Sequence, residues 1–264
     1  MNAALDWHLA KALLEWQVEL GVTEAISDAP IDRFAETDEV PLPLAAARQP
    51  APAAAPVVTA PAIDASAEAE RLAGAASDLP ALAEALAAFP HCDLRKGARS
   101  CVFADGNPAA RVMIIGEGPG REEDQRGLPF VGQAGRLLDQ MFAAIGLARN
   151  APSPETALYI TNTVPWRPLG NREPTPEELA MLRPFLMRHI ELADPELVVL
   201  MGNVACHSVL GQRGILKLRG QWQTVLGRPT LPMLHPAYLL RNAEAKREAW
   251  ADLLSLQARM RALP

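Results

Sequence analysis

The sequence predicts an α/β fold, with three α/β/α layers around a central, mainly four-stranded parallel sheet and a helical extension at the N-terminus. Short apolar runs of strand length alternate with longer helical patterns from residue 111 onward, which is typical of a parallel sheet covered by helices on both faces. The 264 residues are 49% hydrophobic, enough to bury one large core. Three cysteines are too few for a disulfide framework.

The N-terminal third has a different character. Its first residues form an apolar stripe at helical spacing, made of Leu5, Leu9, Leu13, Trp16 and Leu20. We therefore expect an amphipathic helix and acidic segment over residues 1–40, followed by an Ala/Pro-rich linker over residues 41–65. We expect the acidic helix to dock on the body of the protein or on a protein partner.

The α/β domain is expected over residues 66–264. We expect helices over residues 66–88, 133–146, 176–193, 203–211 and 242–261. We expect strands over residues 111–116, 157–162, 196–202 and 229–234. Ligands of such folds bind outside the carboxyl ends of the strands. Polar or glycine motifs follow three of these strands, so we expect one crevice at Gly116-Glu117-Gly118, Thr161-Asn162 and His235-Pro236.

Charge is distributed unevenly along the chain. The whole chain carries −6, but residues 1–90 carry −10 and residues 91–264 carry +4. The C-terminal part is therefore basic enough for a nucleic-acid partner, which the whole-chain charge conceals. No apolar run reaches the roughly 18 residues that a membrane span needs. We expect a monomer in the reducing cytoplasm, with no membrane association.

The segment GEGPGREEDQRGLPFVG, residues 116–132, directly follows an expected strand. Arg121 stands where a dinucleotide fingerprint needs Gly or Ala, and no Walker lysine follows. Acidic residues around this turn would also repel a phosphate. A metal hydrolase is disfavoured because His207 and His235 have no metal-ligand spacing. His207 fits an ordinary helix residue, whereas His235, fixed at a strand end before Pro236, is the better catalytic candidate.

Four segments then carry a resemblance: GEGPGREED, GLPFVGQAGRLLDQM, YITNTVPWRPLGNREPTPEE and HPAYLLRN. In this order, from Cys92 to Leu256, they resemble the uracil-DNA glycosylase superfamily, most closely its family 4. The resemblance implies an enzyme that flips uracil out of DNA and hydrolyses the N-glycosidic bond. The product would be an abasic site, which initiates base excision repair. Its partner would be uracil-containing DNA.

The resemblance also implies site residues. Phe130 would stack on the flipped base, Asn162 would read its edge, and His235 would hydrogen-bond the uracil O2 as negative charge develops. The catalytic set is Glu117, Asn171 and His235. The uracil-binding set is Gly118, Glu123, Phe130 and Asn162. The DNA-binding set is Arg167, Leu239, Leu240 and Arg241. Whether Glu123 or Asp124 contacts the base, the water or only the loop backbone stays open.

One departure from the family concerns a cofactor. The resemblance implies a [4Fe-4S] cluster on four cysteines, but only Cys92 remains, and the other positions fall on Phe89, Trp166 and Leu182. We therefore expect no cofactor and no metal, with apolar packing in place of the cluster. The chain also lacks the basic, histidine-containing insertion after Gly214 that marks the crosslinking branch.

Two other functions remain open. The first is a DNA-binding repair scaffold that kept the fold and lost turnover, although the intact set of catalytic residues favours an enzyme. The second is a glycosylase for another deaminated base, such as hypoxanthine or xanthine. Asn162 favours uracil without deciding between these bases.

Overall fold

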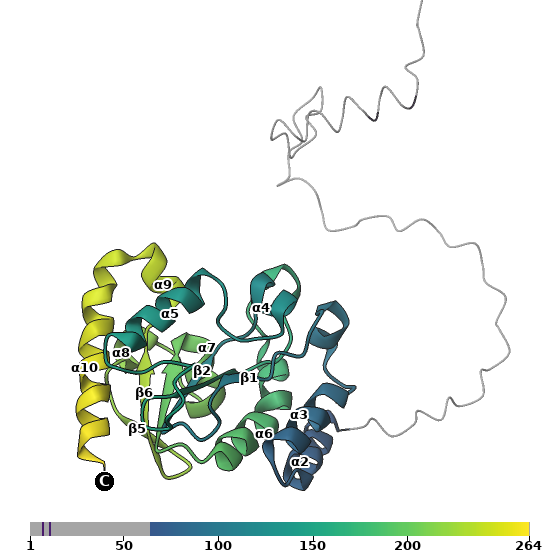
Figure 1. Cartoon of the computed structure of the whole chain (residues 1–264). Helices are drawn as coiled ribbons and strands as arrows, with labels where there is room; N and C mark the ends of the chain where they lie inside the picture. The colour runs from purple at the N-terminus through teal and green to yellow at the C-terminus, as the bar shows by residue number, and fades with distance from the viewer. Residues whose placement is uncertain (1–6, 8–10, 12–63, 264) are drawn as a thin grey trace, which may run out of the picture. The chain divides into compact units, whose positions relative to one another are not determined.

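The computed structural model describes Trp7, Lys11 and residues 64–263 (Figure 1). The helix expected over residues 1–40 and the linker expected over residues 41–65 fall almost entirely outside this part, so both stay predictions. The chain divides into two units, and the second begins at Pro61 and contains the sheet. None of the helices in the described part is long and apolar enough to cross a membrane.

The second unit is built around a six-stranded mixed sheet with the order β1-β3-β2-β4-β6-β5. The strands are β1 (Ala104–Gly106), β2 (Val112–Gly116), β3 (Leu158–Asn162), β4 (Leu197–Met201), β5 (Gln223–Val225) and β6 (Arg228–Met233). The four central strands are parallel, and β1 and β5 pair antiparallel at the two edges. The α/β fold with a mainly four-stranded parallel sheet is thus confirmed. The edge strands were missed because each has three residues and shows no periodicity.

Helices surround this sheet. They are α2 (Ala65–Ala75), α3 (Leu79–Ala88), α4 (Arg121–Arg126), α5 (Gln133–Ala143), α6 (Pro176–Ala193), α7 (Gly202–Leu210), α8 (Ile215–Leu218), α9 (Pro236–Arg241) and α10 (Lys246–Ala262), with 3-10 turns η1 (Asp93–Gly97), η2 (Leu169–Asn171) and η3 (Ala243–Ala245). The single helix expected over residues 66–88 is two helices. The side chain of Asp78 caps a new helix by accepting from the Ala81 N–H at 2.8 Å.

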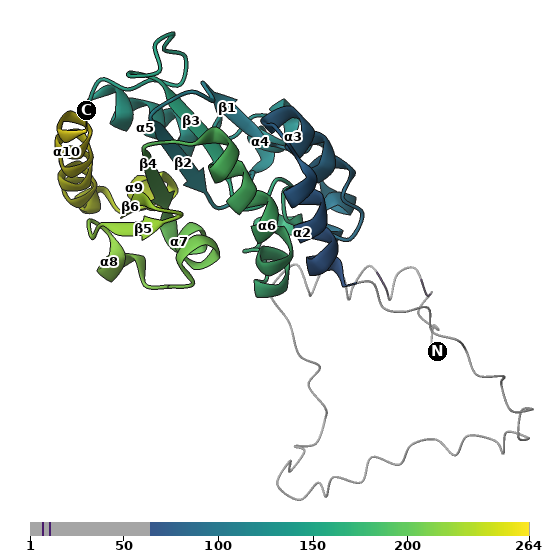
Figure 2. The same cartoon turned by 90° about the horizontal axis from the view of Figure 1, so that it is seen from below.

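The three layers follow from alternation along the central strands. Val112 and Ile114 face a core that includes side chains of α5 and α10. Met113 and Ile115 face a second core that includes side chains of α6 and α7. Figure 2 shows α10 and α6 on opposite sides of the sheet. A third cluster joins α2 and α3 to α6. The three-layer prediction is therefore confirmed.

The strand order reverses at β2. From β2 the chain passes through α4 and α5 to β3, and then through α6 to β4, which lies on the other side of β2. In open α/β sheets a ligand binds at such a switch point, outside the carboxyl ends of the strands. Gly116 pairs with Asn162 in the parallel register, so the loops after β2 and β3 start side by side.

Candidate active site

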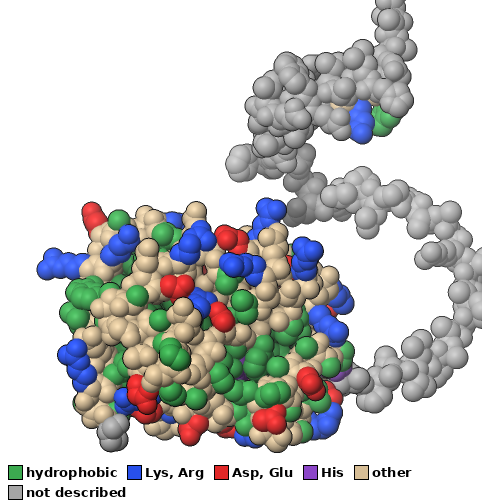
Figure 3. Space-filling model, viewed as in Figure 1, with side chains coloured by type: hydrophobic (Ala, Val, Ile, Leu, Met, Phe, Trp, Pro, Cys, Tyr) green, Lys and Arg blue, Asp and Glu red, His purple; other side chains and the backbone are tan. Residues whose placement is uncertain are grey.

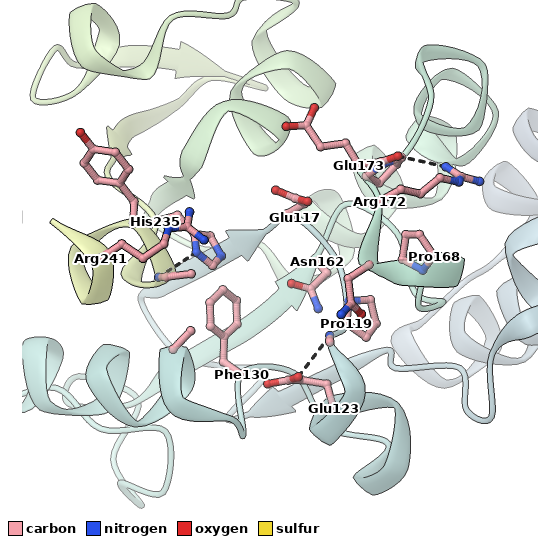
Figure 4. A pocket seen from close by; sticks show the side chains of 17 residues that line it. Glu117, Pro119, Glu123, Phe130, Asn162, Pro168, Arg172, Glu173, His235 and Arg241 are labelled. Carbon is pink, nitrogen blue, oxygen red and sulfur yellow. Dashed lines mark hydrogen bonds between the residues drawn. The ribbon is translucent and has the colours of Figure 1, made fainter. Parts of the chain in front are cut away.

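A pocket with a cavity volume of about 480 Å³ opens at this switch point. The ends of β2 and β3, the loop before α5, the segment around η2 and the start of α9 all contribute to its walls (Figure 4). It brings together eight residues expected from the sequence: Glu117, Gly118, Glu123, Phe130, Asn162, Asn171, His235 and Arg241. The three strand ends therefore do converge on one crevice.

Gly116 allows two of these side chains to approach the sheet. A Cβ at position 116 would lie 2.4 Å from Cε2 of Phe130 and 2.5 Å from Oδ1 of Asn162. Any side chain there would displace the Phe130 ring, the Asn162 carboxamide or both. The absence of a side chain at Gly116 thus makes room for the Phe130 ring and the Asn162 carboxamide.

Asn162 has a buried donor without a partner. Its Nδ2 atom is buried and makes no hydrogen bond to any described residue. An unpaired buried amide costs about 1–3 kcal/mol, so native structures rarely keep one without a reason. Asn162 lines the pocket, and Figure 4 shows its carboxamide at the cavity. A ligand that offers an acceptor would satisfy this donor.

His235 is held in one tautomer. It is the N-cap residue of α9, and its Nδ1 atom accepts a hydrogen bond from the Ala237 N–H at 3.1 Å. The ring proton is therefore on Nε2, which is free to donate. Burial, and to a smaller extent the nearby Arg241, lowers the His235 pKa to about 4. At neutral pH the ring is an uncharged donor at the pocket.

Phe130 and Gly202 both lie close to His235. The ring centroids of Phe130 and His235 are 5.5 Å apart, with 29° between the two planes. A Cβ at position 202 would come within 3.1 Å of the His235 Cβ, and Gly202 has φ +91°. Glycine is therefore needed there for both its conformation and its small size.

Besides Glu123, two carboxylates line the cavity, those of Glu117 and Glu173. Burial raises the Glu117 pKa, and the like charge of Glu173 raises it further. Figure 4 shows both side chains at the pocket. Glu173 was not expected as a site residue, although it lies inside the quoted motif GNREPTPEE. It is exposed, with its nearest basic partner Arg213 at 3.8 Å.

The segment around η2 has unusual backbone geometry. Gly170 and Asn171 both adopt the left-handed conformation, with φ 68° and 55°. Arg167 donates from Nε to Oδ1 of Asn171 at 2.7 Å. This bond leaves the Nδ2 group of Asn171 available at the pocket. Arg167 is thus placed as a support of Asn171, and its expected contact with DNA stays a prediction.

The carboxylates of Glu123 and Asp124 accept hydrogen bonds from backbone N–H groups. The Glu123 carboxylate accepts from the N–H groups of Gly120, Val131 and Gly132 at 3.1, 2.9 and 2.8 Å. Asp124 is buried and accepts from the N–H groups of Arg99 and Ser100 at 2.8 and 3.1 Å. The bonds of Glu123 close the loop around the pocket, and those of Asp124 fasten α4 to the segment after η1. A contact of Glu123 with a base stays a prediction.

Leu239, Leu240 and Arg241, which were expected to bind DNA, lie on the short helix α9. His235 at the N-cap and Pro236 at the first position favour a helix there. Leu239 is 1% exposed and packs with Leu234, so its side chain is a core residue in this structure. Leu240 is 47% exposed and Arg241 is exposed. The sequence alone could not show which of Leu239 and Leu240 is buried and which is exposed.

Basic side chains lie on the helices next to the pocket. Figure 3 shows Lys and Arg gathered along the edge formed by α9, α5 and α4. Arg121, Arg126, Arg136 and Arg241 on these helices are all exposed. Exposed Glu122 on α4 lies among them and pairs with Arg136 at 3.7 Å, so this edge carries charges of both signs.

The four positions where the resemblance places cluster ligands lie together but do not fit the group. Phe89, Cys92, Trp166 and Leu182 share one buried cluster and are at most 3% exposed. A [4Fe-4S] cluster needs four thiolates. Only Cys92 could supply one, and burial raises its pKa to about 11, so it is a neutral thiol. No group of three or more metal-ligating side chains occurs among the described residues.

Comparison with known proteins agrees with this geometry. A model of the uracil DNA glycosylase superfamily matches residues 103–254. The type-4 uracil-DNA glycosylase of Thermotoga maritima is 40% identical over 154 residues, which are 57% of this chain and 77% of that protein. The type-4 enzyme of Archaeoglobus fulgidus is 36% identical over 170 residues, 61% of this chain and 82% of the relative. The type-4 enzyme of Saccharolobus solfataricus is 32% identical over 197 residues, with coverages of 71% and 88%.

The family match covers more than half of the chain and contains the β2 loop, the Asn162 strand end and the His235 turn. The chain therefore belongs to the uracil DNA glycosylase superfamily.

Proposed function

We propose that this protein is a uracil-DNA glycosylase that flips uracil out of DNA and hydrolyses its N-glycosidic bond, which leaves an abasic site for base excision repair. The observation that carries the proposal is the pair of unpartnered donors at one pocket: the buried Nδ2 group of Asn162 and the neutral Nε2–H of His235. Its relatives named type-4 uracil-DNA glycosylases support it.

Asn162 selects the base. Its Nδ2 group donates to O4 of uracil, and its Oδ1 accepts from the uracil N3–H. Cytosine presents a donor at position 4 and an acceptor at N3, so both hydrogen bonds would be lost. A site built for hydrogen bonds discriminates strongly because its buried polar groups would stay unpaired with the wrong base.

Phe130 holds the flipped base. Its ring faces the cavity next to His235 (Figure 4) and would stack on the pyrimidine ring. Extruding a nucleotide costs a few kcal/mol, and stacking and hydrogen bonds in the pocket offset this cost. A cavity of about 480 Å³ lies within the usual range of small-ligand pockets.

His235 stabilises the leaving group. When the bond between C1′ of the sugar and N1 of uracil breaks, the bonding electrons stay on uracil and delocalise to O2. The Nε2–H of His235 donates a hydrogen bond to O2 as this charge develops. A preorganised donor aimed at developing charge typically contributes about 10²–10³-fold to kcat.

Glu117 and Asn171 handle the water. The cationic sugar left at C1′ is attacked by a water molecule, whose oxygen forms the new bond. Glu117 accepts a hydrogen bond from this water and can take up its proton, and uracil is released after it gains a proton. Asn171 orients the water through its free Nδ2 group, and the negative charge of Glu117 favours the cationic sugar.

The surface around the pocket binds DNA. Leu240 enters the base stack as an apolar wedge, and Arg241 contacts a phosphate. Arg167 contributes near the η2 segment, and Glu123 and Gly118 shape the loop that holds the base. Leu239 is part of the core, so we do not assign it a DNA contact.

The protein works without an iron–sulfur cluster, because Phe89, Trp166 and Leu182 fill three ligand positions with apolar side chains. Iron and acid-labile sulfide measured in the full chain, with the absorbance near roughly 400 nm that such clusters give, test this point. A cluster bound in stoichiometric amount would contradict it. We place this enzyme in the cytoplasm as a monomer that uses no membrane, with the N-terminal acidic segment available for a protein partner.

Release of uracil tests the function. A labelled oligonucleotide with one uracil is incubated with the purified full chain in excess EDTA, in single- and double-stranded form. We expect wild type to cleave and His235→Ala to be about 10²–10³-fold slower in kcat. Binding of DNA without cleavage would indicate the repair scaffold. Faster cleavage of hypoxanthine or xanthine than of uracil would indicate the other base specificity.

A further inference from the structure

Phe130 has a strained backbone. It is a non-glycine residue with φ 52°, in the left-handed region that bulky side chains rarely adopt. Strain of this kind persists only where the surroundings hold it in place. The Phe130 backbone also lies close to α5, because a Cβ at position 135 would lie 1.8 Å from the Phe130 carbonyl oxygen. Gly135 at the start of α5 therefore allows the close approach.

Arg149, in the segment after α5, supports one side of this turn. Its Nη2 donates to the Phe130 carbonyl at 2.8 Å, and its Nη1 donates to the Pro129 carbonyl at 2.9 Å. The same guanidinium is fixed by two carboxylates, Asp105 at 2.8 Å and Asp139 at 2.9 Å. Its side chain is only 15% exposed. One planar group thus joins β1, α5 and the loop that carries Phe130.

Glu123 holds the other side of the same turn. Its carboxylate accepts from the N–H groups of Val131 and Gly132. The two carbonyls at and before Phe130 are therefore fixed by a cation, and the two N–H groups after it are fixed by an anion. Each support is charged, and hydrogen bonds of this type are roughly twice as strong as neutral ones.

We propose that Arg149 is a positioning residue for base recognition: it holds the Phe130 backbone in its left-handed conformation and so fixes the plane of the ring against which uracil stacks. This inference rests on the proposed function. Arg149 does not line the pocket and does not touch the base. It acts through Phe130, so its effect depends on the presence of that ring.

Guanidinium geometry is essential to the arrangement. A lysine at position 149 would keep the positive charge between Asp105 and Asp139. A single ammonium cannot reach two carbonyls and two carboxylates in the planar fork that Arg149 uses. Arg149→Lys should therefore fold and still lose the orientation of Phe130.

A double-mutant cycle between Arg149 and Phe130 tests the inference. The measurements are the inhibition constant of free uracil, which reports the base pocket alone, and kcat/KM for a uracil-containing oligonucleotide. We expect Arg149→Ala and Arg149→Lys to weaken uracil inhibition and lower kcat/KM about 10-fold in the wild-type background. In the Phe130→Ala background the same substitutions should change either value less than about twofold, because coupled residues are not additive.

Arg219→Ala is the matched control. Arg219 is 19% exposed, pairs with the carboxylate of Asp252 and donates to the Glu248 carbonyl at 2.7 Å, and none of these residues lines the pocket. It should lower the temperature of unfolding and leave uracil inhibition unchanged in both backgrounds.

The outcomes separate the two proposals. If wild type releases no uracil, the proposed function is overturned and this inference with it. If wild type is active but the Arg149 and Phe130 effects multiply, Arg149 does not act through Phe130 and the inference alone is overturned. Full activity and uracil inhibition in Arg149→Lys would overturn it as well, because the charge alone would then suffice.

Discussion

The pocket and the cluster that joins α2, α3 and α6 lie in the same unit of the chain but differ in the groups that they bury. At the pocket, Phe130 and Asn171 have left-handed backbones and Asn162 keeps a buried donor without a partner. In the α2–α3–α6 cluster, Phe89 packs edge-on against Phe185 at 5.3 Å, and neither residue has a left-handed backbone. Among the described residues, two of the four non-glycine positions with positive φ and one of the four buried side-chain atoms without a partner thus belong to the pocket.

This contrast separates positions filled by apolar packing from positions that present polar groups at the cavity. Phe89, Trp166 and Leu182, at three positions where the resemblance places cluster ligands, are apolar, and their burial stabilises the fold. At the pocket the cost of an unpaired amide is retained, which is expected when function and stability are in conflict. Substitutions in the apolar cluster should therefore change stability, and substitutions at the pocket should change activity.

Phe89→Ala should have the largest effect, and on stability. The side chain is fully buried among α3 and α6, and truncating such a phenylalanine typically costs about 3–5 kcal/mol in the free energy of unfolding. Urea unfolding measures this cost. Uracil release per folded molecule should stay within about twofold of wild type, because Phe89 does not line the pocket. A large loss of uracil release per folded molecule would show that the α2–α3–α6 cluster and the pocket are coupled.

Asn162→Ala should lower activity and leave stability unchanged, the reverse of Phe89→Ala. It removes the two hydrogen bonds to uracil, each of about 0.5–1.5 kcal/mol, so kcat/KM should fall about 10- to 100-fold. It also removes the buried Nδ2 group that has no partner among the described residues, so the free energy of unfolding should not decrease. A substantial loss of stability would mean that Asn162 holds the fold together rather than awaiting a ligand.

Gly116→Ala and Gly74→Ala form a pair across the two regions. The new Cβ at position 116 would displace Phe130 and Asn162, and we expect kcat/KM to fall about 10-fold because misplaced groups lose catalysis. Gly74 lies inside α2 with nothing within 4 Å of its would-be Cβ. Gly74→Ala should raise the free energy of unfolding by about 0.4–1 kcal/mol. Equal activities in the two variants would contradict the close packing inferred at Gly116.

Much of this architecture could be predicted from the sequence, for identifiable reasons. The central strands are continuous apolar runs, and α6 has its predicted bounds. In the structure Thr175 and Glu178 form a capping box at its start, with Pro176 between them. The convergence of three strand ends followed from the parallel order of the strands. In contrast, α9 is only six residues long, too short for a periodic signal, so the exposure of Leu240 rather than Leu239 could not be read from the pattern.

The contacts by which Arg149 and Glu123 support the pocket could not be predicted from the sequence. Arg149 bonds to Asp105, Pro129, Phe130 and Asp139, and no local spacing links these positions. The resemblance placed Glu123 in the uracil-binding set and left its contact open, and the structure shows its carboxylate accepting hydrogen bonds from backbone N–H groups. Residues that act through backbone contacts leave no signature in side-chain patterns, and only the folded chain reveals them.

The smallest effect concerns pH and separates Glu173 from ordinary surface acids. Glu117 acts as a carboxylate in the proposed reaction, and burial together with Glu173 raises its pKa. Activity should therefore fall, as pH decreases, at a higher pH than an unperturbed glutamate would give. Glu173→Gln removes a negative charge, lowers the Glu117 pKa and shifts the acid limb of the kcat profile to lower pH.

The shift should be a fraction of a pH unit and should shrink at high salt, because Glu173 is exposed and its field is screened. On the acid limb, Glu173→Gln should thus be faster than wild type, and near neutral pH the two should be equal. Glu84→Gln makes the same charge change at an exposed position of α3. It should leave the pH profile of kcat unchanged. An acid limb that moves equally in both variants would reflect net charge, whereas a limb that moves in neither would remove Glu173 from the electrostatics of the pocket.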